Sequence, residues 1–139
     1  MTRQFTLGKK ERLKSRKKIE QLFKEGKSFS VFPFRVYYLL EGTSQPGKDG
    51  SPVQFGVGVS SRNFKKAVDR NRIKRLTKES FRLQKPGLMT VIQEKSHRLD
   101  LFFIFTGKEL PDFDLVKEKT AVALSKLGKI IHEDPSPHT

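Results

Sequence analysis

The spacing of apolar residues near the start of the chain predicts a short helix. Ile19, Leu22 and Phe23 recur at i, i+3 and i+4, and Ser15 just before them has the short polar side chain of an N-cap residue. We therefore expect a helix over residues 16–25 whose apolar stripe packs against the rest of the domain.

Two later stretches alternate as strands do, because every second side chain of a strand falls on the same face. Residues 32–40 place on one face Phe34, Val36, Tyr38 and Leu40, and residues 53–60 place on one face Val53, Phe55, Val57 and Val59. The loop between them, 41–52, is dense in Gly, Pro and Ser. The pattern predicts a long hairpin in which these two strands pair.

The opposite faces of the two strands differ. In the first strand the opposite face carries Arg35 and Tyr37, a pair that can stack a base and hold a phosphate. In the second strand it carries only Gly56, Gly58 and Ser60. Such a bare surface indicates that something approaches the backbone closely, either a packed helix or a strand of nucleic acid.

The residue spacing over 68–83 predicts a basic helix with one largely apolar side and one basic side. At about 100° per residue, one side holds Ile73, Leu76, Ser80 and Leu83, and the other holds Asn71, Lys74, Arg75, Lys78 and Arg82. Pro86 and Gly87 are expected to end the helix. The first side can pack in a core, whereas the cations of the second have to meet water or an anion.

The remaining elements are a buried strand and a final helix. The run LFFIF, residues 101–105, is continuously apolar and predicts a strand buried on both faces. Because a helix separates it from the preceding strand, the two are expected to form a parallel β-α-β unit. Pro111 and Asp112 open the last helix, whose apolar stripe is Phe113, Val116, Thr120, Ala123 or Leu124, Leu127 and Ile131.

These elements predict an α+β fold, a single-domain α/β sandwich with the order α-β-β-α-β-α around one small sheet. The 139 residues suffice for one domain with its own core, and 12 Phe residues supply large side chains for it. We expect one folded domain over residues 1–131, in which residues 1–14 form a basic arm, and a disordered tail over residues 132–139.

The positive charge of the chain is concentrated in two segments. The net charge is +14, and residues 1–30 and 62–83 each contribute +7, while the charges of the remainder cancel. Such confinement favours a defined site for a polyanion over the plainer interpretation of a solvated basic face. An anionic membrane surface is disfavoured because neither segment opposes its cations with a wide apolar face.

Residue types that catalysis needs are sparse. The absence of Cys excludes disulfides and thiolate metal sites, and the three histidines lie far apart, with His97 expected in a polar loop. Asp112 and Asp114 form a tight pair of carboxylates, but their place at a helix start favours capping. The sequence has neither clustered carboxylates for two-metal hydrolysis nor a Gly-rich phosphate loop, so we interpret the chain as a binder.

The N-terminal segment is basic and lacks the apolar region of an export signal. The longest apolar run, residues 101–105, is far shorter than a membrane span. We therefore expect a soluble cytoplasmic protein that contacts no membrane.

The basic helix lies within a longer pattern, GVGVSSRNFKKAVDRNRIKRLTKESFRL, over residues 56–83. This pattern resembles the signature of the bacterial ribonuclease P protein subunit, whose hallmark is an Arg-Asn-Arg motif in a basic helix. Here the motif is Arg70, Asn71 and Arg72. The likeness extends more weakly through FTLGKKERLKSRKKIEQLFKEG, residues 5–26, and the order of elements agrees over about residues 5–130.

The resemblance implies an accessory role for this chain. In this family the catalyst is a large RNA that uses bound magnesium ions to cut the 5′ leader from precursor tRNA, so no catalytic residue, cofactor or metal is expected in the protein. The expected partners are the ribonuclease P RNA and precursor tRNA, and no DNA. The family also implies a left-handed crossover in the β-α-β unit, against the general rule.

Two sets of site residues follow from the resemblance. The family's basic helix contacts the catalytic RNA, which assigns to that contact Arg62, Lys65, Lys66, Arg70, Asn71, Arg72, Lys74, Arg75, Lys78 and Arg82. A cleft between the sheet and the first helix holds the single-stranded leader, which assigns to the cleft Ile19, Phe23, Ser28, Phe34 and Tyr37. Ile19 stands where relatives often have Phe, and Ser61 with Arg62 where they commonly have two lysines.

Two other classes of function stay open. A structural RNA-binding protein of the ribosomal type would also concentrate its charge, but it would not assist leader cleavage. A protein nuclease that needs no RNA is a weaker alternative, because the residues for its chemistry are missing.

Overall fold

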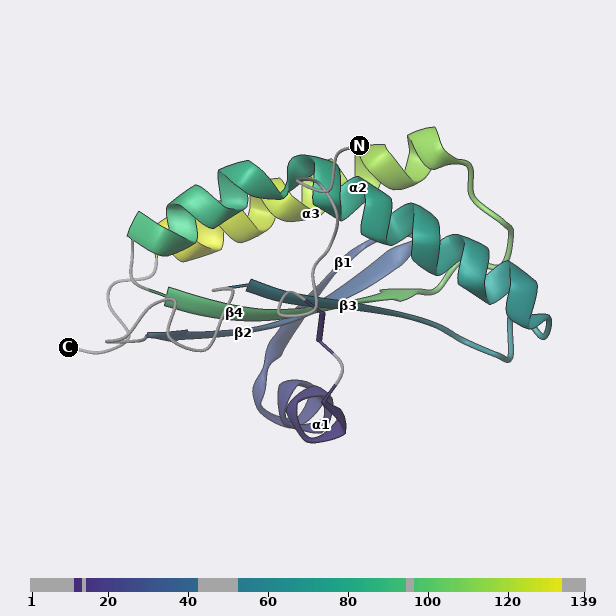
Figure 1. Ribbon diagram of the computed structural model, residues 1–139, viewed down its shortest axis with the longest axis horizontal. Helices are drawn as coiled ribbons and strands as arrows, with labels where there is room; N and C mark the ends of the chain where they lie inside the picture. The colour runs from purple at the N-terminus through teal and green to yellow at the C-terminus, as the bar shows by residue number, and fades with distance from the viewer. Residues whose placement is uncertain (1–11, 14, 43–52, 95–96, 134–139) are drawn as a thin grey trace, which may run out of the picture.

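The computed structural model describes residues 12–13, 15–42, 53–94 and 97–133. The elements follow in the order α1 (Arg16–Glu25), β1 (Lys27–Val31), β2 (Phe34–Gly42), β3 (Val53–Val59), α2 (Ala67–Glu94), β4 (His97–Phe105) and α3 (Phe113–Glu133). The strands form one sheet in the order β1-β2-β4-β3. Helices α2 and α3 cover one face of the sheet and α1 lies against the other (Figure 1). The predicted α+β class is confirmed.

The sheet departs from the prediction at its edge. β1 was not expected, so the observed order is α-β-β-β-α-β-α rather than α-β-β-α-β-α. Its sequence, KSFSV, is short and largely polar, and it pairs antiparallel with β2 through a turn that contains the cis peptide bond between Phe32 and Pro33. An edge strand with few buried side chains leaves only a weak periodic signal.

The predicted hairpin between β2 and β3 is wrong. β4 lies between them, antiparallel to β2 and parallel to β3. The most apolar strand takes an interior position, where α2 and α3 cover one of its faces and α1 lies against the other. The parallel pairing of β3 with β4 around α2 confirms the β-α-β unit, and its left-handed sense stays a prediction.

Helix α2 is longer than expected. It continues through Pro86 to Glu94 instead of ending near Leu83. A proline inside a helix removes one backbone hydrogen bond, but Leu88 and Ile92 extend the buried stripe beyond it. The apolar area that these two side chains bury offsets the cost of the proline.

The core lies between the sheet and the pair α2 and α3, and aromatic side chains dominate it. The rings of Phe55 and Phe81 stack with centroids 4.1 Å apart and planes 2° from parallel, and Phe103 meets Phe55 edge-on at 5.1 Å. The buried side of α2 consists of Ile73, Thr77, Ser80, Phe81, Leu88 and Ile92. The helix is therefore turned from the predicted phase, and Leu83, expected in the core, is 41% exposed.

Helix α1 matches its predicted bounds, and Ser15 caps it by accepting a hydrogen bond from the Lys18 N–H at 3.3 Å. The bare face of β3 is covered by a side chain of the neighbouring strand β4 rather than by a packed helix. The ring of Phe102 lies over Gly56 and Gly58, and a Cβ at Gly56 would be 2.7 Å from that ring. Glycine is needed at position 56 because the neighbouring strand's side chain fills that space.

The two ends of the predicted domain are partly described. Leu13 is buried, and its N–H donates to the Phe55 carbonyl at 2.9 Å, so this part of the predicted arm adds to the edge of β3. α3 includes His132 and Glu133, two residues that were expected in the tail. The rest of the arm, most of the loop 41–52 and the rest of the tail lie outside the described residues. None of the described helices is long and apolar enough to span a membrane.

Asp100 provides a test of this packing. It is buried on the α1 side of β4, and its Oδ1 has no hydrogen-bond partner within the described part of the chain. Burial raises the pKa of the Asp100 carboxyl, although the nearby cations of Arg98 and Lys18 oppose the shift. A raised folded-state pKa means that stability falls as the pH rises from the ordinary carboxyl value through the folded value.

Asp100→Asn keeps the shape and removes the buried charge. We expect it to raise the free energy of unfolding at pH 7 by about 1 kcal/mol and to flatten the fall in stability with pH, as measured by denaturant unfolding. Glu20→Gln, the same exchange at an exposed position, should change neither. A less stable Asp100→Asn variant at pH 7 would contradict this explanation.

Candidate nucleic-acid interface

The first half of α2 and the loop before it form a cationic surface. Its exposed members, which we call the cationic ridge, are Lys65, Lys66, Asn71, Arg72, Arg75 and Lys78. Ile73, Thr77 and Phe81 turn the opposite side of α2 into the core, so these polar side chains point away from the sheet. Lys74 and Arg82 are half-buried beside the ridge, and Arg62 is exposed in the loop. The structure thus brings together the residues predicted to contact RNA.

Arg70, the first residue of the Arg-Asn-Arg motif, has a structural contact as well. Its Nη1 donates to the carbonyl oxygens of Phe64 at 2.7 Å and Lys65 at 2.9 Å. These bonds fix the loop that carries Lys65 and Lys66 against the first turn of α2. Arg70 therefore positions part of the ridge, and it is itself half-buried.

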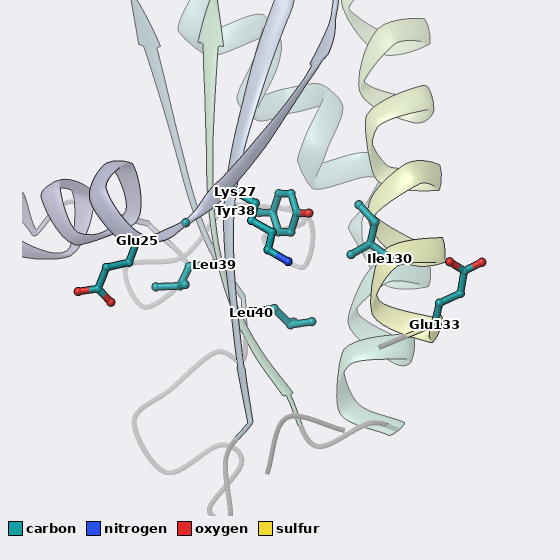
Figure 2. Close-up of a pocket in the computed structure, with 8 residues that line it drawn as sticks. Glu25, Lys27, Tyr38, Leu39, Leu40, Ile130 and Glu133 are labelled. Carbon is teal, nitrogen blue, oxygen red and sulfur yellow. The ribbon is translucent and has the colours of Figure 1, made fainter. Parts of the chain in front are cut away.

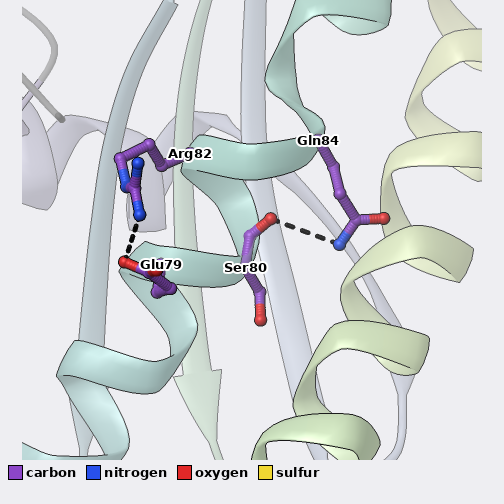
Figure 3. Close-up of polar contacts among 4 residues, drawn as sticks. All are labelled: Glu79, Ser80, Arg82 and Gln84. Carbon is purple, nitrogen blue, oxygen red and sulfur yellow. Dashed lines mark hydrogen bonds and ion pairs between the residues drawn. The ribbon is translucent and has the colours of Figure 1, made fainter. Parts of the chain in front are cut away.

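The far end of the ridge is also held in place. The guanidinium of Arg82 forms an ion pair with Glu79 one turn earlier (Figure 3). Gln84 donates from Nε2 to the Ser80 carbonyl and to the Lys117 carbonyl, both at 3.2 Å, which links α2 to α3. Arg82 consequently offers an anion less positive charge than Arg75 does.

A second candidate surface lies on the α1 side of the sheet. The aromatic cluster there consists of Phe23, Tyr37 and Phe102: the Phe23 ring lies 4.8 Å from Tyr37 and 5.5 Å from Phe102, centroid to centroid. Phe23 is nevertheless 45% exposed. The guanidinium carbon of Arg35 lies 5.8 Å from the Tyr37 ring centroid. An open aromatic surface beside a cation is suited to unpaired bases and their phosphates.

Hydrogen bonds that Arg35 donates to β1 hold its guanidinium in that position. Its Nη2 donates to Ser28 Oγ at 3.2 Å and its Nη1 donates to Ser30 Oγ at 3.3 Å. Ser28 stands directly across from Tyr37 in the β1–β2 register. The strand that the sequence pattern missed therefore positions a cation beside the aromatic cluster.

The structure brings only part of the predicted leader-binding set together on one surface. Phe23, Ser28 and Tyr37 lie together, and Ile19 is half-buried on the same helix. The assignment of Phe34 to the cleft is wrong, because its side chain is 1% exposed and packs against Phe103 and Phe105 in the core. Because side chains alternate along β2, Phe34 and Tyr37 must lie on opposite faces of the sheet.

Two residues of this surface were not assigned from the sequence. Arg35 was recognised beside Tyr37 but was left out of the leader-binding set. Phe102 was missed because the run LFFIF suggested burial on both faces, whereas Phe102 and Ile104 are only half-buried on the α1 side. Every second residue of that run, Phe102 and Ile104, faces the α1 side. The sequence could indicate that these two share a face, but whether that face is buried depended on the position of β4 in the sheet.

A third surface does not suit a polyanion. A cavity of about 320 Å³ lies between the end of α1, β2 and the end of α3 (Figure 2). Its lining includes two acidic residues, Glu25 and Glu133, and one basic residue, Lys27, together with Leu39 and Tyr38. Burial raises the pKa of the Tyr38 hydroxyl, which keeps this group neutral.

The described residues contain no group of three or more His, Cys, Asp or Glu side chains that could hold a metal ion. His97 is not in a polar loop as predicted but buried at the start of β4, which begins before the apolar run. Asp112 caps α3, as expected, by accepting a hydrogen bond from the Leu115 N–H at 2.8 Å.

A basic α+β domain with a cationic ridge over one face of its sheet and exposed aromatic residues on the other defines a small RNA-binding protein. A family model described as Ribonuclease P matches residues 7–128. The chain belongs to the ribonuclease P protein family. Its function is that of the protein subunit of a ribonucleoprotein endoribonuclease that matures the 5′ ends of tRNA, and the catalyst is the RNA.

Individual relatives agree with this assignment. The ribonuclease P protein component of Porphyromonas gingivalis is 39% identical over 124 residues, which cover 89% of this chain and 88% of the relative. That of Chlorobium phaeobacteroides is 33% identical over 122 residues, 82% of each chain. The solved RNase P protein from Thermotoga maritima has a TM-score of 0.62 at 30% identity and covers 84% of this chain and 96% of its own. The resemblance seen in the sequence is confirmed.

Mutation can distinguish the structural contacts of Arg70 from the exposed position of Arg75. Arg70→Ala should lower the free energy of unfolding by about 1–2 kcal/mol, because two charge-assisted hydrogen bonds are lost. Arg75→Ala, an exposed position on the same helix, should change stability by less than about 0.5 kcal/mol. Equal effects of the two variants in denaturant unfolding would show that the Arg70 contacts do not stabilise the loop.

Proposed function

We propose that the chain uses the two faces of its sheet for two RNAs. The cationic ridge binds the ribonuclease P RNA, and the aromatic cluster with Arg35 holds the single-stranded 5′ leader of precursor tRNA. The observation that carries this proposal is the separation of the surfaces: α2 and α3 cover one face of the sheet, while Phe23, Tyr37 and Arg35 lie on the other.

The ridge is suited to a folded RNA. Arg72, Arg75 and Lys78 are exposed on a rigid helix at positions one turn apart or less, so they can follow a line of phosphates. Lys65 and Lys66 add two cations at the N-terminal end of the same helix, where the helix dipole also favours an anion. These positive charges would also screen the repulsion between two large RNAs.

The opposite surface is suited to a single strand. Sequence-tolerant binding of unpaired RNA relies on aromatic rings that stack with bases and on cations that contact the backbone. Phe23 supplies an open ring, Tyr37 supports it, and Arg35 lies beside both. Mature tRNA has no leader, so contacts at this surface would favour the substrate over the product.

The chemistry of cleavage is assigned to the RNA. Magnesium ions held by that RNA would activate water and stabilise the leaving group, as metal ions do in phosphodiester hydrolysis. The protein would act in the cytoplasm on precursor tRNA, with its own residues limited to binding and positioning.

The ridge is tested by salt dependence. Arg72→Ala or Arg75→Ala should weaken binding of the chain to ribonuclease P RNA and reduce the slope of log affinity against log salt by about 0.7–1, because one phosphate contact is lost. Filter binding across a salt series measures both quantities. Lys129→Ala removes an exposed cation from α3 outside the ridge and should leave the slope unchanged. An identical slope in all variants would remove the ridge from the interface.

The aromatic cluster is tested by comparing two substrates. Phe23→Ala or Tyr37→Ala should weaken the affinity of the reconstituted ribonucleoprotein for precursor tRNA by about tenfold or more, since stacking on one base is worth about 1–3 kcal/mol. Affinity for mature tRNA should stay the same.

Leader removal at low magnesium, with and without the chain, verifies that each preparation is active. Val122→Ala, which shortens an exposed apolar side chain on α3, serves as the matched control. Equal losses for precursor and mature tRNA would refute the assignment of this surface to the leader.

A further inference from the structure

An apolar groove lies at the end of the sheet where β4 leads into α3, and its lining shares no residue with the cationic ridge or the aromatic cluster. Its volume is about 570 Å³, and its apolar walls are Phe32, Pro33, Phe105, Leu110, Pro111 and Leu115. Phe32, in the turn between β1 and β2, is 72% exposed, more than any other large hydrophobic side chain of the described residues. Burial in the core does not explain an aromatic side chain in this position.

The floor of the groove is held together by hydrogen bonds. The backbone N–H of Thr106 donates to the Pro33 carbonyl at 2.7 Å, and its Oγ1 donates to the same oxygen at 3.1 Å. Gly107 packs so closely that a Cβ there would be 2.9 Å from the Phe105 ring. The β1–β2 turn and the segment after β4 thus form one preorganised wall.

The groove is continuous with the start of the cationic ridge. Asn63 Nδ2 donates to the Gly107 carbonyl at 3.4 Å, and the Phe64 ring lies 5.9 Å from Phe105. The carbonyl of Phe64 is one of the two acceptors of Arg70. A single loop therefore connects the groove to Lys65 and Lys66, so an RNA strand held at the ridge would pass close to the groove.

The rim of the groove carries charged side chains. Lys108 is exposed and Glu109 contributes a negative charge. Lys119 is half-buried, and its Nζ lies 3.8 Å from Glu118 Oε2. A hydrophobic wall with a cation at its edge matches a nucleobase and its flanking phosphate.

We propose that this groove binds one unpaired nucleobase of the ribonuclease P RNA, with Phe32 as the stacking surface and Lys108 near the adjoining phosphate. The inference rests on the proposed function, because it requires that the ridge holds this RNA. An apolar segment of a protein would fit the walls as well, but continuity with the ridge favours RNA.

Phe32→Ala tests the proposal in a binding assay with ribonuclease P RNA. We expect about a tenfold loss of affinity with an unchanged salt slope, because a stacked base is lost and no charge is removed. Phe32→Tyr should retain most of the affinity, since it keeps an aromatic ring. Val122→Ala controls for the loss of an exposed apolar side chain outside the groove. Melting temperatures verify that each variant is folded.

The outcomes separate this inference from the proposed function. If Phe32→Ala binds the RNA as tightly as the original chain while Arg75→Ala binds more weakly, the groove is not a base site and the ridge assignment survives. If neither substitution affects binding, the ridge assignment fails too. Equal losses for Phe32→Ala and Phe32→Tyr would also overturn the inference, because stacking would not be the cause.

Discussion

The stack of Phe55 on Phe81 determines how α2 lies on the sheet, and the position of the cationic ridge depends on it. The two rings are parallel to within 2° at 4.1 Å, in the middle of the buried stripe that runs from Ile73 to Ile92. With this side of the helix held in the core, Arg72, Arg75 and Lys78 have to face solvent or RNA. A rotation of the helix by one residue would bury cations at a cost that no contact in this core offsets.

Alternation along β2 provides the second constraint. It sends Phe34 and Val36 into the core beneath α2 and α3, and it sends Arg35 and Tyr37 to the face where α1 lies. One strand thereby builds both the scaffold and the aromatic surface. The core that supports the ridge therefore also separates it from the proposed leader site.

Local features of the fold could be predicted because their causes are local. The bounds of α1 follow from the Ser15 cap and the spacing of Ile19, Leu22 and Phe23. Residue spacing also predicted the exposure of Asn71, Arg75 and Lys78 and the capping role of Asp112. Lys65, Lys66 and Arg72 were assigned through the family resemblance, and the half-buried positions of Lys74 and Arg82 depend on how α2 packs on the sheet.

Features that depend on contacts distant in sequence could not be predicted in this way. Periodicity does not indicate that β4 lies between β2 and β3, so the position of Phe102 over Gly56 stayed hidden. The contacts of Arg70 with the Phe64 and Lys65 carbonyls depend on the path of a loop. Phe34 was assigned to the leader by its place in the resembled family, although the alternation of its strand already contradicted this.

The central claim is that opposite faces of the sheet contact different RNAs. The most direct test places a photoreactive side chain at position 23 or at position 75 in the assembled ribonucleoprotein and identifies the RNA that each one crosslinks. The account predicts that position 75 labels the ribonuclease P RNA with or without substrate, and that position 23 labels the leader only when precursor tRNA is bound. Labelling of the same RNA from both positions would contradict it.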